Sequence, residues 1–223
     1  GLSGAFEDPC WEGLGAEPCI FIKQDILHGI HKFFWDHPTD WLKNLLGVEE
    51  IDHHFIAQPP ISTNRFAGGI SIISQVTRRE HRAFQQAILS IIIGHDHVDN
   101  KVINAISSLL DFSYLAQYPS LSASKIHKME EALTTFHGNK QVFVDNGLQD
   151  PPHFRIPKLH GLQHFISDIT MGGTPNNSST ETLESLHIEM CKEPYLASNH
   201  CGYDKQILNY LDVQDRLAMR YAY

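Results

Sequence analysis

The chain is poor in cysteine, and it has neither a long apolar run nor the layout of a signal peptide. Its four cysteines include no C-x-x-C pair and are too few for a disulfide scaffold, so we expect free thiols. No stretch approaches the roughly 20 apolar residues that a membrane-spanning helix needs. No basic segment followed by an apolar one opens the sequence. These shortages predict a soluble, intracellular protein without a membrane partner.

Positive charge is scarce as well. Lys and Arg number 17 against 26 Asp and Glu, which gives a formal net charge of -9. The densest positive cluster is Arg78-Arg79 with Arg82 nearby. A chain of this charge has no general attraction to a phosphate backbone. Net charge therefore does not support DNA as a partner, and it favours a protein instead.

Apolar residues, by contrast, make up 42% of the chain, and most of them follow helical periodicity. Strand signals are poor, and Cys19–Ile22 is the one candidate. The pattern predicts a mainly α, multi-helix fold with helices over more than half of the chain. We expect an extended leader over residues 1–19, which are rich in Gly, Pro and acid, and a helical region over 20–150. C-terminal helices are expected over 151–223, the last from about Tyr203 to Ala222.

Local signals mark several helix ends. Thr77 and Glu80 have capping-box spacing at the start of one helix, and Gly94 follows its last apolar residue. Pro38 is expected to kink or restart an N-terminal helix that Gly47 ends. The apolar stripes of the predicted helices place these residues among the most buried: Phe33, Trp41, Leu45, Ile88, Ile92, Ile106, Leu110, Leu115, Met129, Leu133, Phe136, Leu162, Phe165 and Ile169.

Fifteen histidines are many for 223 residues, and several are spaced like metal ligands. The pairs are His28 with His31, His53 with His54, His95 with His97, and His160 with His164. Two histidines four residues apart lie on one helix face, and they hold a transition metal when a carboxylate or a third imidazole joins them. The sequence identifies no third ligand. Half-buried histidines bonded to backbone carbonyls are therefore the preferred interpretation.

The stretch from Ser179 to His200 carries a stripe of polar residues at helical spacing. The stripe consists of Glu181, Glu184, His187 and Cys191. An apolar face would not carry two carboxylates, so we expect this stripe to face a groove or solvent. Ser178 and Glu181 have the spacing of a capping box, which gives Glu181 a structural task at the helix start. Glu184 has no such task.

Soft metal ligands also gather in this stretch. They are His187, Cys191, His200 and Cys201. Such residues suit zinc, but the C-x9-C spacing of the two cysteines matches no common zinc module. Thiols that pack between helices are the preferred interpretation.

Six stretches follow one another along the chain: GVEEIDHHF (Gly47–Phe55), GISIISQVTRREH (Gly69–His81), LLDFSYLAQYPS (Leu109–Ser120), FHGNKQVFVDNG (Phe136–Gly147), IPKLHGLQHF (Ile156–Phe165) and TETLESLHIE (Thr180–Glu189). Together they resemble the C-terminal part of Plavaka-type transposases, cut-and-paste elements of fungal genomes related to the CACTA group, over about residues 21–210. The resemblance implies a nuclear DNA-recombination enzyme with an RNase H-like catalytic domain. In that domain a long helical insertion precedes the helix that carries the last catalytic acid, and the helical pattern found here fits such an insertion.

The resemblance also implies a DDE site, in which two aspartates and a glutamate hold two Mg²⁺ or Mn²⁺ ions for phosphodiester cleavage. The glutamate comes last, on a helix, in a stretch similar to TE..ERLH, so Glu181 and Glu184 are the candidates. Because capping accounts for Glu181, Glu184 is the predicted metal ligand, and His187 is a neighbour that orients it or a DNA phosphate. The two aspartates belong upstream of the residues present here. The chain alone is therefore expected to be inactive and not to bind these ions.

The sequence departs from the family pattern at several positions. Ser185 stands where Arg is expected, which weakens a phosphate contact there, and Pro38 interrupts a helix that is expected to be continuous. Asp25 is a poor substitute for either missing aspartate. Glu184 is expected at the edge of a cleft between its helix and the segment Ile20–Asp25, where the RNase H-like sheet would dock.

Three functions from different classes are compatible with the sequence. The first is a C-terminal fragment of a cut-and-paste DNA transposase that holds one acid of the DDE site and is inactive alone. The second is a domesticated, non-catalytic helical module that binds a protein partner or DNA ends. The third is an unrelated metal enzyme that uses the histidine pairs.

Overall fold

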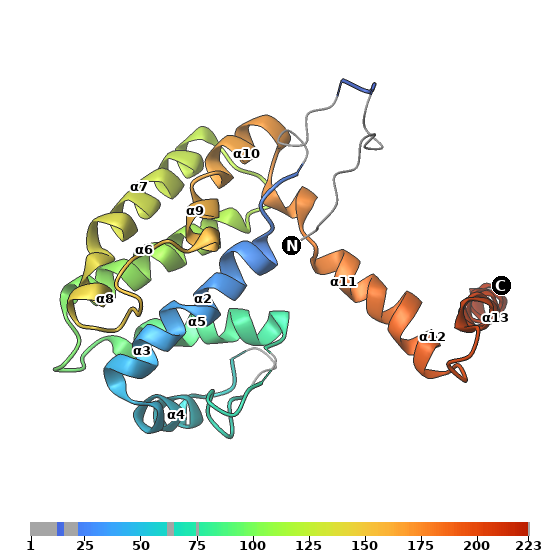
Figure 1. Cartoon of the computed structure of the whole chain (residues 1–223), viewed down its shortest axis with the longest axis horizontal. Coiled ribbons are helices and arrows are strands. Elements are labelled where there is room, and N and C mark those ends of the chain that lie inside the picture. Colours follow the sequence, from blue (N-terminus) through green and yellow to red (C-terminus); the bar gives the residue numbers. More distant parts are fainter. Residues whose placement is uncertain (1–12, 16–21, 62–64, 75, 223) are drawn as a thin grey trace. The chain divides into compact units, whose positions relative to one another are not determined.

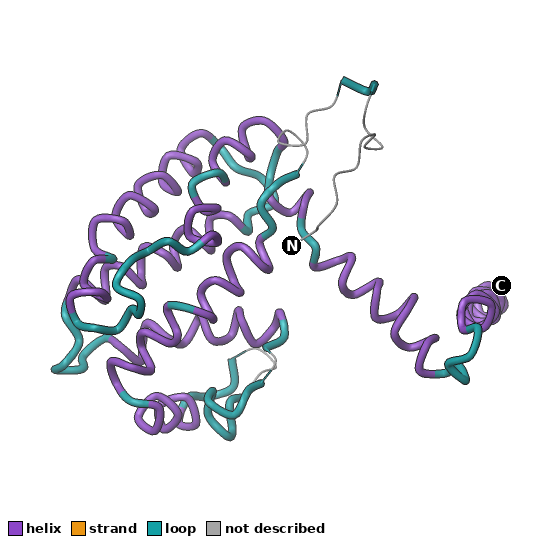
Figure 2. Tube along the Cα trace, in the orientation of Figure 1, coloured by secondary structure: helices purple, strands orange, loops and turns teal. Residues whose placement is uncertain are grey.

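The fold is known from a computed structural model, which describes residues 13–15, 22–61, 65–74 and 76–222. The described residues form helices joined by loops and include no strand (Figures 1 and 2). The prediction of a mainly α fold is therefore confirmed. The strand candidate Cys19–Ile22 lies outside the described residues except for Ile22, which is part of a loop.

The chain divides into two units, Gly1–Ser178 and Ser179–Tyr223, and each is described by itself. The first unit contains η1 (Ile26–His31), α2 (Lys32–Asp36), α3 (Pro38–Leu46), α4 (Val48–Ala57), α5 (Arg78–Ile92), α6 (Asn100–Ala116), α7 (Ala123–Asn139), α8 (Gln141–Asp145), α9 (Pro157–Leu162), α10 (Phe165–Gly172) and η2 (Pro175–Ser178). The second contains α11 (Glu181–His187), η3 (Ile188–Lys192), α12 (Glu193–Leu196) and α13 (Tyr203–Ala222). The elements η1 and η3 are π-helical, and η2 is a 3-10 turn.

The core of the first unit lies between its longer helices and the N-terminal segment. Helices α6 and α7 make the most extensive contact, and the loop 117–122 reverses the chain between them, so that they run antiparallel (Figure 1). Phe33, Phe34 and Phe84 are each no more than 1% exposed, and the rings of Phe34 and Phe84 meet edge to face at 6.0 Å. Aromatic side chains buried in this way supply much of the hydrophobic free energy that holds the helices together.

The helix-end signals act as predicted. The Thr77 hydroxyl accepts a hydrogen bond from the Glu80 N–H (3.3 Å), and the Glu80 carboxylate accepts one from the Thr77 N–H (2.7 Å), which completes the capping box of α5. Pro38 restarts the chain as the first residue of α3. Gly47 ends that helix at a φ of 90°, a conformation that residues with a Cβ rarely adopt. These signals depend only on neighbouring residues, and they hold in the folded chain for that reason.

The predicted core is confirmed with two exceptions. Leu45 and Leu115 are only half-buried, and the other predicted positions are buried. The helical stretch around Leu159 to Ile169 is broken at Gln163 and His164, which separate α9 from α10.

Replacing Ile92 by Ala is expected to lower the free energy of unfolding of the first unit by about 2 to 5 kcal/mol. Ile92 is fully buried at the end of α5, and truncation would leave a cavity there. The matched control is Ile93→Ala, because Ile93 is 55% exposed and its loss should cost no more than about 0.5 kcal/mol. Urea titrations followed by tryptophan fluorescence measure both variants. Equal losses would show that the apolar stripe of α5 is misassigned.

Candidate functional site

The predicted acidic stripe lies on α11 in the second unit. Glu184 and His187 are exposed and Glu181 is half-buried, so these side chains are accessible to water. The expected position of Glu184 beside residues 20–25 would join the two units, which are described separately. That position stays a prediction.

The predicted capping box at the start of α11 is wrong. The N-cap residue is Thr180 and Glu181 is the first residue of the helix, so Glu181 does not stand at the third helical position that a capping box requires. Ser178 belongs to the preceding 3-10 turn, where its hydroxyl donates to the Pro175 carbonyl (3.2 Å). Because the capping role is lost, it no longer separates Glu181 from Glu184 as a candidate acid.

The residues of α11 do not build an ion site on their own. Glu181 and Glu184 are one turn apart, and Mg²⁺ requires about six oxygen ligands in an octahedral arrangement. Among the described residues, Glu181, Glu184 and His187 do not bring three donor atoms within 4.8 Å of one another. No step of phosphodiester cleavage can therefore be assigned to these residues alone.

The cysteines of the second unit are free thiols, as predicted. Cys191 and Cys201 are both exposed, so the expectation that they pack between helices is wrong. Cys10 and Cys19 lie outside the described residues. The four predicted soft ligands of this stretch do not come together as a group of three or more.

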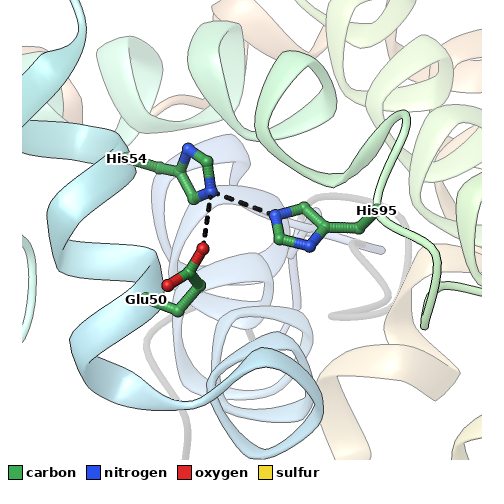
Figure 3. A group of neighbouring side chains, drawn as sticks. All are labelled: Glu50, His54 and His95. Atoms are coloured by element: carbon green, nitrogen blue, oxygen red, sulfur yellow. Dashed lines mark hydrogen bonds and ion pairs between the residues drawn. The ribbon is translucent and has the colours of Figure 1, made fainter.

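A different group of possible metal ligands forms in the first unit, from Glu50, His54 and His95 (Figure 3). The Nε2 atom of His54 lies 3.2 Å from the Glu50 carboxylate and 3.0 Å from Nε2 of His95. The two rings meet edge to face with their centroids 5.1 Å apart. This is the one group of three His, Cys, Asp or Glu in ligand range within the described ranges of the chain.

Packing against the core places these side chains. Helix α4 buries Ile51 and Phe55, and the Phe55 ring stacks on Phe84 of α5 at 5.1 Å. That contact fixes the rotation of α4 about its axis. It thereby sets the positions of Glu50 and His54, which are one turn apart on the same helix.

A second anchor fixes His95. Ile91 and Ile92 are buried at the end of α5, and Gly94, at a φ of 91°, then turns the chain so that His95 approaches α4. The three side chains line an open groove of about 630 Å³, to which Asp96 and His97 also contribute.

A carboxylate also holds α4 against the loop that follows it. Asp52 accepts hydrogen bonds from the N–H groups of Ile70 (2.7 Å) and Ser71 (3.0 Å), and the Ser71 hydroxyl donates to the same carboxylate. Burial alone would raise the pKa of Asp52, but the bonds from Ser71 and Ile70 outweigh it and leave the pKa below its ordinary value. This carboxylate thus ties the helix that carries Glu50 and His54 to residues 70 and 71.

The metal-ligand group takes its two histidines from two different pairs predicted from the sequence. His54 and His95 come from two different predicted pairs, and His53 is exposed beside them. His160 and His164 do face each other, with their Nε2 atoms 3.3 Å apart, but both are exposed and no third ligand in range joins them within the described part of the chain. The expectation that these two rings are half-buried is therefore wrong.

The pair His28 and His31 separates in the structure. Nδ1 of His28 lies 2.6 Å from the carboxylate of Asp25. Asp25 is the N-cap residue of η1, so it has a structural role at this helix start. His31 is buried, its Nδ1 lies 3.0 Å from the Gln85 side-chain oxygen, and its ring stacks on His81 at 6.2 Å. Burial lowers the pKa of both His31 and His81 to about 4. These two rings are neutral at pH 7.

The sequence contained part of the signal for the metal-ligand group. Glu50 and His54 have i,i+4 spacing, which puts a carboxylate and an imidazole on one helix face. His95 is 41 residues further on, and only the packing of α4 against α5 brings it to them.

No family model, no curated protein and no solved structure matches this chain. None of the described helices combines the length and the apolar character of a transmembrane span. The expected resemblance to transposases therefore stays a prediction that depends on the six stretches and their order alone.

Proposed function

We propose that this chain is the C-terminal part of a cut-and-paste DNA transposase, in which Glu184 supplies the last acid of a DDE site. The observation that carries the proposal is the occurrence of the six stretches in one order within 143 residues, from Gly47 to Glu189. A mainly helical chain is what the insertion of such an enzyme requires. As part of such an enzyme the chain would act on DNA in the nucleus.

Contacts between the stretches support this proposal. Asp52, in the first stretch, holds Ile70 and Ser71 of the second. Phe112, in the third, meets Phe165 of the fifth edge to face at 5.8 Å. The stretches that carry the resemblance thus pack against one another within this chain, as parts of one fold would.

Helix α11, which the sixth stretch forms, offers the proposed acid to solvent. Glu184 is exposed in the second unit, where an upstream catalytic region could reach it. The chain's own contribution is one or two carboxylates, and the proposal therefore requires two further acids from outside these residues.

A non-catalytic helical module that binds a protein is the second candidate, and the apolar surface of the second unit favours it. Large exposed hydrophobic residues of this unit include Leu183, Leu186, Ile188, Met190, Leu196, Leu208, Val213, Leu217 and Met219. Together with a net charge of -9, this surface suits a protein more than a DNA duplex.

The genomic sequence that precedes the codon for Gly1 tests the proposal directly. We expect an open reading frame that continues upstream and places two aspartates at the ends of predicted strands of an RNase H-like sheet. An upstream frame without such aspartates, or an in-frame stop, would contradict the proposal. A gel-shift titration of the chain with random duplex DNA then tests the second candidate, because a DNA-binding module would show affinity that falls steeply with salt and a protein-binding module would show none.

A further inference from the structure

We propose that Glu50, His54 and His95 form a binding site for a divalent transition metal ion, and that Zn²⁺ is the ion it fits best. The site lies wholly in the first unit, far along the sequence from α11. It does not depend on the proposed transposase function.

Two of the three donor-atom distances already match those between ligands of one ion. Zinc binds histidine nitrogen and carboxylate oxygen at about 2.0 to 2.2 Å, so that two ligands of a tetrahedral ion lie about 3.3 Å apart. The two distances from His54 Nε2, 3.2 Å to Glu50 and 3.0 Å to His95, are close to this value. The third pair of donor atoms, from Glu50 and His95, lies within 4.8 Å, so an ion could contact all three side chains.

Without an ion, the hydrogen-bonding needs of these three side chains are poorly satisfied. Nε2 of a neutral imidazole carries either one proton or one lone pair. If Nε2 of His54 is protonated and that of His95 is not, it has one hydrogen for two acceptors, Glu50 and His95. If Nε2 of His54 is unprotonated, it can accept a hydrogen bond from His95, but its lone pair then also faces the Glu50 carboxylate. A cation placed among the three atoms accepts a lone pair from each of them.

The donor set and the groove select the class of ion. Two imidazoles and one carboxylate suit zinc and its neighbours in the first transition row, whereas Mg²⁺ and Ca²⁺ require more oxygen ligands than this site has. Three protein ligands leave a fourth position, which opens to the groove of about 630 Å³. That position would hold water or a small anionic ligand.

Binding would connect α4 with the loop between α5 and α6. The unfolded chain does not hold the three side chains together, so an ion that binds the folded chain stabilises it. We therefore expect zinc to raise the melting temperature of the protein, and the rise to depend on all three side chains.

Titration of the metal-free protein with Co²⁺, followed by visible absorption, tests the site. A tetrahedral Co²⁺ ion gives intense visible bands that an octahedral ion lacks. For the unaltered chain, freed of metal by a chelator and then dialysed, we expect these bands to saturate at one equivalent and to disappear when Zn²⁺ is added. No bands and no rise of the melting temperature with Zn²⁺ would overturn the proposal.

Variants locate the ion. His54→Gln and His95→Gln are each expected to weaken Co²⁺ binding at least tenfold, and Glu50→Gln to weaken it by a smaller factor. The matched control is His53→Gln, which removes an exposed histidine next to His54 on the same helix and should bind as the unaltered chain does. Circular dichroism of each metal-free variant verifies that it folds, and Glu50→Gln, at a half-exposed surface position, provides the result if a histidine variant does not.

Other clusters are tested in the same way. The double variants His160→Gln/His164→Gln and Cys191→Ser/Cys201→Ser should keep full Co²⁺ binding. Loss of binding in either one, with binding retained in His54→Gln and His95→Gln, would place the ion elsewhere and overturn the assignment.

Discussion

Acidification from pH 7 to pH 4 is expected to reduce the stability of the first unit by about 3 kcal/mol for each of two buried histidines, His31 and His81. His31 is 0% exposed and His81 is 4% exposed. Burial is the main cause that lowers the pKa of each to about 4. The charges of Arg82 and His81 also lower the pKa of His31. The charge of Lys32 also lowers the pKa of His81. In the unfolded chain both would titrate near 6.5.

The sign follows from which state binds more protons. Between pH 6.5 and about 4 the unfolded chain binds protons at these two positions and the folded chain does not, so unfolding becomes more favourable as the pH falls. Above pH 6.5 both states are neutral at these positions and the effect vanishes. Below about pH 4 both states are protonated, and the loss levels off.

Urea titrations at a series of pH values, followed by tryptophan fluorescence, measure this loss. Trp35 and Trp41 belong to the first unit, and no tryptophan occurs after residue 178, so the signal reports on the unfolding of the first unit. His81→Phe, which keeps a ring beside Trp35 and removes the titrating group, should reduce the loss from these two histidines by half or more, because the charge of His81 also lowers the pKa of His31. The control is His53→Phe, at an exposed position of α4, which should change this loss far less than His81→Phe does. A stability that is level from pH 6.5 to 4.5 would contradict the account.

If the proposed transposase function holds, replacing Glu184 by Gln is expected to lower DNA strand cleavage on the order of a thousandfold in the protein assembled from this chain and the proposed upstream catalytic region. The amide has the size of the carboxylate but no charge, and a two-metal site needs the charge of its acids to hold the ions. Glutamine at this exposed position should change the melting temperature little compared with its effect on cleavage.

The control for this variant is Glu181→Gln, which makes the same change one turn earlier on α11. Since the capping argument no longer distinguishes the two residues, their comparison decides between them. Cleavage lost in Glu181→Gln and kept in Glu184→Gln would move the last acid to Glu181. Cleavage kept in both would remove α11 from the active site.

Local signals predicted the helices well, because a helix end is decided by residues close in sequence. Thr77 and Glu80 begin α5 as expected, and Pro38 and Gly47 bound α3. The same reasoning failed at Ser178, because a 3-10 turn ends there and uses its hydroxyl. Spacing alone does not tell a capping box from such a turn.

Burial was predictable wherever an apolar stripe was clear. Which functional side chains come together was not predictable. The rings of His54 and His95 meet through contacts of α4 with α5 that no local pattern indicates. The exposure of Cys201 was likewise missed, because the sequence does not say whether a residue between two helices is covered. For the acidic stripe of α11, the sequence predicted accessible side chains, and Glu184 is exposed.

The central claim is that this chain completes a DDE active site whose other acids lie upstream, and cleavage of supercoiled plasmid DNA in Mg²⁺ or Mn²⁺ tests it most directly. The account predicts no nicking above background by the chain alone. It predicts metal-dependent nicking when the chain is joined to the upstream region. Nicking by the chain alone that persists after mutation of Glu181 and Glu184, or no nicking by the joined protein, would contradict the claim.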